Sequence, residues 1–94
     1  MKNVSQLIEE HRHLGKCLKL ELSADKQSFY VEGSKDALLF LSELIVATAH
    51  RQGNVCQDGS CTNISRFDQP SFITDKSINF LRFQVTEGTV PPSM

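Results

Sequence analysis

One long helix, expected between residues 34 and 51, constrains the fold more than any other part of the sequence. Ser34 is a natural N-cap, and Asp36 places a negative charge in the first turn, where the helix dipole favours it. Gly53 follows the last turn, which is typical of the end of a helix. These signals place one well-defined helix in the middle of the chain, and the other elements have to pack around it.

The apolar side chains of this helix cover more of its circumference than one contact requires. At 100° per residue they span roughly 200°, whereas a stripe over one sheet needs about 100°. The opposite side is polar except for Leu39 and Val46 in its middle. Either the N-terminal helix or the C-terminal tail covers the excess, or the helix contacts a second subunit or a partner protein. The wide apolar arc contains Ala37, Leu38, Phe40, Leu41, Leu44, Ile45, Ala47 and Ala49.

Alternating segments on both sides of the helix predict an antiparallel sheet. Residues 16–23 and a second run around Phe29 and Val31 are separated by a turn, so they indicate a hairpin. Residues 77–86 form another alternating run, and a short strand is possible near residues 62–67. The expected core consists of Leu18, Leu20, Leu22, Phe29, Val31, Leu38, Leu41, Leu44, Ile45, Leu81, Phe83 and Val85.

A short helix over residues 4–14 is expected to precede the hairpin, with Asn3 and Gln6 as a capping box and Gly15 as its stop. The predicted fold is therefore α+β: an antiparallel sheet of three to four strands with the long helix on one face and the short N-terminal helix beside it. At 94 residues the chain has room for one domain, spanning residues 1–94. Residues 87–94 are expected to form a flexible tail.

Charge and hydropathy exclude several classes of partner. Ten Lys and Arg oppose eleven Asp and Glu, giving a net charge of −1 with no basic cluster that would bind a nucleic acid. The longest apolar-rich stretch, Ala37 to Ala49, contains Glu43 and is too short to span a bilayer. No hydrophobic signal region follows Met1, so we expect a cytoplasmic protein without a membrane or nucleic-acid partner.

The cysteines carry the only chemistry that the sequence suggests. Three cysteines, an odd number, fit reduced thiols better than a disulfide framework. Cys56 and Cys61 bracket an Asp58-Gly59 turn, so they could be two thiols without a role, a disulfide, or metal ligands together with His50 and a further candidate, Cys17. The sequence contains no nucleophile elbow and no phosphate loop, so we expect neither enzyme activity nor a cofactor.

The middle of the chain resembles a family of small bacterial proteins. Residues 20–44 read LELSADKQSFYVEGSKDALLFLSEL, which is a strand, a turn, a strand ending at a helix cap and a Leu-rich helix. This succession resembles the immunity protein 32 family. The resemblance implies a protein that neutralises a co-encoded toxin by binding it, without catalysis.

Three functions follow from these features. The first is a cytoplasmic protein-binding module of the immunity type, which contacts its partner through its surface. The second is a homodimeric structural or regulatory domain joined through Leu39 and Val46. The third is a small metal or redox protein built on Cys56 and Cys61. The candidate contact residues on the outer side of the long helix are Leu39, Glu43, Val46 and His50.

Overall fold

The chain begins with a short helix whose first turn is closed by its own side chains. A computed structural model of the protein describes residues 1–67 and 72–86. Helix α1, Val4–Glu10, has the predicted capping box: the Asn3 side chain accepts the Gln6 N–H, and the Gln6 side chain accepts the Asn3 N–H, both at 2.9 Å. The chain continues as a 3-10 helix, η1, Arg12–Cys17, so the α-helix is shorter than the predicted span of residues 4–14.

The predicted hairpin is confirmed. Strands β1, Leu18–Leu22, and β2, Phe29–Gly33, are antiparallel, and Leu20 lies opposite Val31. The other edge of β1 is occupied by a segment from the C-terminal half. Leu20 donates its N–H to the Phe72 carbonyl and accepts the Thr74 N–H, with Ile73 in a parallel bridge. No third strand can therefore pair with β1 at this edge.

Helix α2, Lys35–Ala49, begins where the cap predicts, because Ser34 Oγ accepts the Ala37 N–H at 3.1 Å. It ends in a Schellman motif. Gln52 donates its N–H to the Ala47 carbonyl at 2.8 Å, and Arg51 donates to the Thr48 carbonyl at 2.9 Å. The residue in the left-handed conformation is Arg51, with φ of 60°, and not a glycine.

Gly53 lies beyond the end of α2, but it is not the residue that terminates the helix. A Cβ atom at this position would lie 2.0 Å from the Cys61 carbonyl oxygen, so only glycine permits the close approach of the loop to the next strand.

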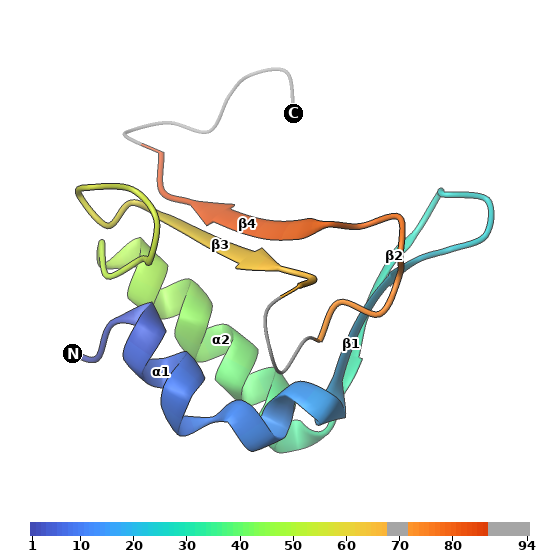
Figure 1. Cartoon of the computed structure of the whole chain (residues 1–94), viewed down its shortest axis with the longest axis horizontal. Helices are drawn as coiled ribbons and strands as arrows, with labels where there is room; N and C mark the ends of the chain where they lie inside the picture. Colours follow the sequence, from blue (N-terminus) through green and yellow to red (C-terminus); the bar gives the residue numbers. More distant parts are fainter. Residues whose placement is uncertain (68–71, 87–94) are drawn as a thin grey trace.

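The remaining strands form a second sheet over the helices. Strand β3, Cys61–Ser65, pairs with β4, Phe80–Gln84, in antiparallel register, with Thr62 opposite Phe83. Figure 1 shows α1 and α2 side by side beneath β3 and β4, and the β1–β2 hairpin at the other end of the molecule. Thr48 and Thr62 connect α2 to β3 through buried hydroxyl groups 2.6 Å apart.

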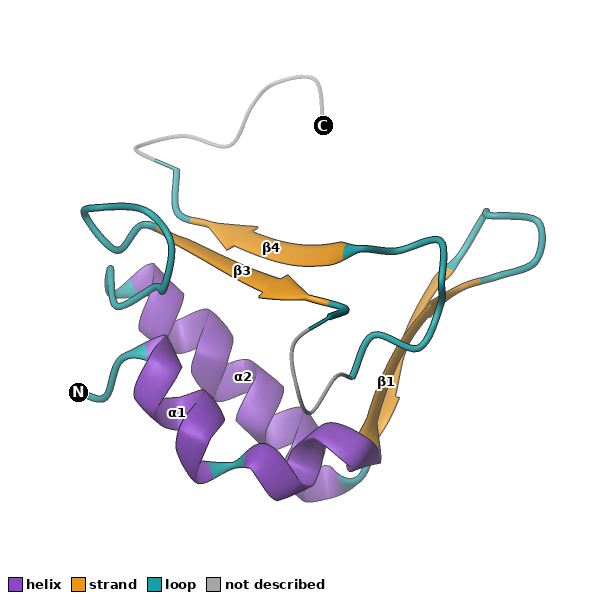
Figure 2. Cartoon of the chain, viewed as in Figure 1, coloured by secondary structure: helices purple, strands orange, loops and turns teal. Residues whose placement is uncertain are grey.

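The α+β class is confirmed, but the single sheet of three to four strands is wrong. Within residues 1–67 and 72–86, the strands form two separate two-stranded sheets, which Figure 2 shows in different orientations. The reason is that residues 72–75 occupy the edge of β1 as an irregular segment, so the two pairs of strands do not join. The predicted tail, residues 87–94, lies outside the described residues.

The core lies between the two helices, β1 and β3. Leu18, Leu20 and Leu44 are buried as predicted. Five further core predictions, Leu22, Leu41, Leu81, Phe83 and Val85, are half-buried. Four are wrong, because Phe29, Val31, Leu38 and Ile45 are exposed. The buried cluster contains Val4, Leu7, Leu18, Leu20, Ala37, Phe40, Leu44, Ala47, Ile64, Phe72 and Ile73.

Candidate protein-binding surface

The outer side of α2 carries two pairs of exposed apolar side chains, separated by the exposed Ser42. We call Leu38, Leu39, Ile45 and Val46 the α2 stripe; they are 41%, 50%, 47% and 49% exposed. The helix packs on the core through the opposite side of its circumference. That buried side consists of Ala37, Phe40, Leu44, Ala47 and Thr48. The excess of apolar surface that the sequence predicts is therefore real, and within the described residues neither α1 nor another element covers it.

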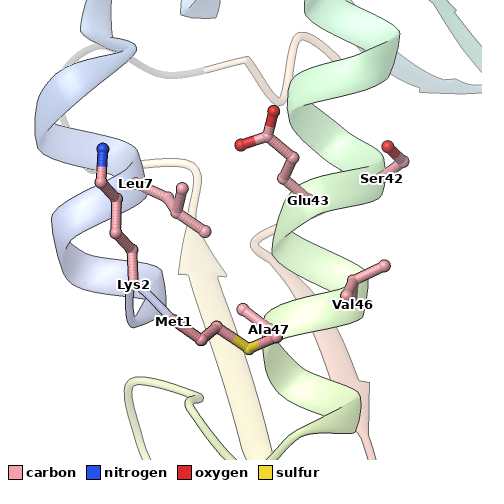
Figure 3. A pocket seen from close by; sticks show the side chains of 7 residues that line it. All are labelled: Met1, Lys2, Leu7, Ser42, Glu43, Val46 and Ala47. Carbon is pink, nitrogen blue, oxygen red and sulfur yellow. The ribbon is translucent and has the colours of Figure 1, made fainter.

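Two residues of the α2 stripe, Leu39 and Val46, border grooves between α1 and α2. Val46 lines a groove of about 320 Å³ between α1 and α2, together with residues of α1 such as Leu7 (Figure 3). Leu39 lines a second groove of about 420 Å³ that reaches His11. Glu43 lines both grooves. A side chain from a partner could therefore enter beside the stripe at either of two places.

Strand β2 is a second element with exposed apolar side chains. All five of its residues are exposed, and Phe29, Tyr30 and Val31 are 47%, 49% and 39% exposed. Because these three apolar residues are consecutive, they place apolar side chains on both faces of the strand. The sequence shows this run directly, and it differs from the strict alternation of β1.

The main chain of β2 leaves one edge of the hairpin open. Ser23 donates its N–H to the Ser28 carbonyl, and Ser34 donates to the Cys17 carbonyl, which fixes the alternation of the ladder. Tyr30 and the other even-numbered residues of β2 therefore bond to β1, and the odd-numbered residues direct their N–H and C=O groups outward. In the described part of the chain, no strand pairs with that outer edge.

The four predicted contact residues are exposed, but they do not form one cluster. Leu39, Glu43 and Val46 border the grooves between α1 and α2. His50 is the C-cap residue of α2, where its backbone N–H bonds to the carbonyls of the last turn. Sequence reasoning predicted the strand β2 but missed its exposed surface, because Phe29 and Val31 were assigned to the core.

Cys56 and Cys61 are joined as a disulfide, with their Cα atoms 5.2 Å apart. This corrects the expectation of reduced thiols for these two residues and removes both from any set of metal ligands. Cys17 is a free, exposed thiol on another part of the surface. Residues 1–67 and 72–86 contain no group of three or more His, Cys, Asp or Glu side chains that could hold a metal ion.

Comparisons with known proteins leave the surface as the main guide to function. No protein-family model matches the sequence, and neither the curated proteins nor the solved structures contain a significant match. No helix in the described residues has the length and apolar character needed to cross a membrane. The resemblance to the immunity protein 32 family stays a prediction.

Proposed function

We propose that this chain is a protein-binding module whose contact surface is the α2 stripe together with β2. The observation that carries the proposal is the exposure of four large apolar side chains on one side of a helix that already packs its other side on the core. Exposed large apolar side chains gathered on one side of a helix are a feature of protein interaction sites, because water contact with them is unfavourable.

An immunity role would specify the kind of partner that this module binds. The hairpin and helix that resemble the immunity protein 32 family, residues 20–44, are the segment that carries β2 and half of the α2 stripe, Leu38 and Leu39. Under this proposal the partner is a toxin encoded beside the protein, and binding alone neutralises it. The partner would have an apolar patch, because the stripe offers few charges: Lys35 and Glu43 flank it with opposite signs.

Expression of the adjacent gene tests this role. We expect its product to be toxic alone, to be harmless together with this protein, and to co-purify with it. Leu39→Glu and Val46→Glu should abolish both protection and co-purification, because each places a charge in an apolar contact. Ser5→Glu is the matched control: it adds the same charge at an exposed position of α1 and should protect fully. A harmless neighbour, or full protection by Leu39→Glu, would contradict the proposal.

A homodimer is the second candidate, and the open edge of β2 favours it. Two copies of β2 could pair antiparallel about Val31, because the N–H and C=O groups of this residue point outward. The pairing would join two hairpins into one four-stranded sheet. It would also bring the α2 helices of the two copies toward one another, as each helix starts directly after its β2.

Sedimentation at micromolar concentration distinguishes the two candidates. If the protein is a dimer through β2, Val31→Pro should make it monomeric, because proline removes an outward N–H without removing a bond to β1. Leu39→Glu should also weaken a dimer that uses the helix. A wild-type protein that is monomeric at all concentrations would reject the dimer and leave the module with a different partner.

A further inference from the structure

The Cys56–Cys61 disulfide lies directly beside a positive charge. The Arg82 guanidinium, on the outer face of β4, lies 3.3 Å from Cys61 Sγ and 3.8 Å from Cys56 Sγ. Its Nε donates to the Gln84 side chain at 3.3 Å, which holds the guanidinium over the sulfur atoms. The Ser60 hydroxyl lies 3.7 Å from Cys61 Sγ. Cys61 thus has two polar groups that could stabilise a negative charge on its sulfur.

The two cysteines differ in their accessibility. Cys61 is the first residue of β3 and is only 2% exposed, whereas Cys56 lies in the preceding loop and is partly exposed. An incoming thiolate can therefore approach Cys56 more readily than Cys61. Attack on a disulfide is fastest when the leaving sulfur is stabilised as a thiolate. The disulfide therefore joins an accessible sulfur, Cys56 Sγ, to a sulfur that can leave as a stabilised thiolate, Cys61 Sγ.

We propose that Cys56–Cys61 is a thiol–disulfide exchange site, opened by a dithiol reductant and assisted by Arg82. The thiolate of the dithiol forms a bond to Cys56 Sγ, the S–S bond breaks, and Cys61 leaves as a thiolate beside the guanidinium. The second thiol of the reductant loses its proton, attacks its own sulfur in the mixed disulfide and releases Cys56 as a thiolate, which takes up a proton. The dithiol is oxidised to a disulfide, and the two cysteines are reduced.

Opening the bond releases the loop that closes the edge of β3. Asn54 accepts the Asn63 N–H at 2.9 Å and donates to the Asn63 carbonyl at 3.2 Å, and Val55 donates its N–H to the Cys61 carbonyl at 3.3 Å. These contacts lie on exposed or half-buried residues, so the disulfide is the covalent constraint that keeps them in place. Reduction would expose the outer edge of β3.

Reduction kinetics test the role of Arg82 in a Cys17→Ser background, which leaves only the two cysteines of the site. With dithiothreitol as reductant, Arg82→Gln should slow reduction by about three- to tenfold, because the departing thiolate loses a charge-assisted contact. Arg82→Lys should retain most of the rate. Arg12→Gln removes a positive charge far from the sulfur atoms and should leave the rate unchanged. Equal rates for Arg82→Gln and Arg12→Gln would overturn the assignment of Arg82.

A monothiol identifies which sulfur is attacked. After acid quenching of a brief reaction with 2-mercaptoethanol, we expect the mixed disulfide on Cys56, as found by mass spectrometry. A mixed disulfide found mainly on Cys61 would overturn the proposed direction of attack.

Amide exchange tests the release of the loop. Reduction should accelerate exchange at Val55 and Asn63, whose N–H groups bond within the loop contact. It should leave Thr62 protected, because the N–H of Thr62 points toward β4. Unchanged exchange at Val55 and Asn63 would show that the loop stays closed without the disulfide and would contradict the release.

Discussion

The two sheets of this protein have the same size but differ in how their edges are treated. Each contains two antiparallel strands of five residues. The outer edge of β3 is closed by the side chain of Asn54 and by the disulfide-bonded loop. The outer edge of β2 is open and carries exposed apolar side chains. Proteins usually protect such edges against unwanted pairing, whereas the open edge of β2 offers unpaired N–H and C=O groups to a strand from another chain.

Core truncation gives the largest expected difference between the two sheets. Ile64→Ala in β3 should lower the free energy of unfolding by about 2–5 kcal/mol, because it leaves a cavity under a buried side chain. Val31→Ala in β2 should lower it by less than about 1 kcal/mol, since Val31 is already exposed. Urea denaturation measures both values. Equal losses would mean that Val31 is buried in solution, for example in a dimer.

The buried pair Thr48 and Thr62 joins α2 to the β3–β4 sheet through a hydrogen bond whose donor and acceptor are defined. Thr48 donates to the Leu44 carbonyl at 2.8 Å, so the Thr62 hydroxyl has to donate to Thr48 Oγ1. Thr48→Val leaves the buried Thr62 donor without that acceptor and should cost about 1–3 kcal/mol of stability. Thr62→Val should cost less, because Thr48 keeps its bond to Leu44. The double variant should recover part of the loss. Equal costs for the two single variants would contradict this direction of donation.

Removing the Asn54 side chain should open the outer edge of β3 and should lower the free energy of unfolding by less than Thr48→Val does. Asn54→Ala should lower the free energy of unfolding by about 1 kcal/mol and accelerate amide exchange at Asn63. Asn79→Ala is a matched control, because the Asn79 side chain accepts a bond from the Arg66 side chain and does not close a strand edge. Its effect should stay below about 0.5 kcal/mol. Unaltered exchange at Asn63 in Asn54→Ala would show that this amide does not close the edge.

The smallest expected effect is a pH-dependent loss of hydrogen bonding at the edge of β1 that residues 72–75 cover. Hydrogen bonds from the Ser77 hydroxyl, the Ser77 N–H and the Leu22 N–H lower the pKa of Asp75 below its ordinary value. The charged carboxylate therefore stabilises the fold at neutral pH, and this contribution is lost as the pH falls through the lowered pKa.

The protection factor of the Leu22 amide, the exchange rate of an unfolded chain divided by that of this amide at the same pH, should accordingly decrease below about pH 4, and Asp75→Asn should reduce this pH dependence. Thr62, in the other sheet, should serve as the unaffected reference. A response of the same size at both amides would indicate global acid unfolding in place of a local effect.

Local signals in the sequence predicted the elements well and their assembly less well. The capping box at Asn3, the cap at Ser34 and the hairpin are where the pattern places them, because short-range hydrogen bonds determine these features. The division into two sheets depends on contacts between residues 18–22 and 72–75, which are far apart in the chain. Such contacts leave no periodic signal in either segment.

The same distinction applies to the candidate surface. The width of the apolar arc predicted more apolar surface than one core contact buries, to be covered either by the N-terminal helix or C-terminal tail or by a second protein; Leu39 and Val46, on the other side of the helix, are exposed among the described residues. Periodicity could not indicate which part of the arc is buried, so Leu38 and Ile45 were placed in the core. The proximity of Arg82 to the cysteines was also beyond sequence reasoning, since it depends on the register of β3 with β4.

The short spacing of the two bonded cysteines has a consequence for the energetics of the whole fold. They are five positions apart, so the covalent ring restricts only a small part of the unfolded chain. In the loop-closure description, a ring of this size contributes about 2 kcal/mol of entropic stabilisation, less than a long loop would. The bond is therefore a local tether, and the hydrophobic cluster between helices and strands can persist whether the tether is closed or open.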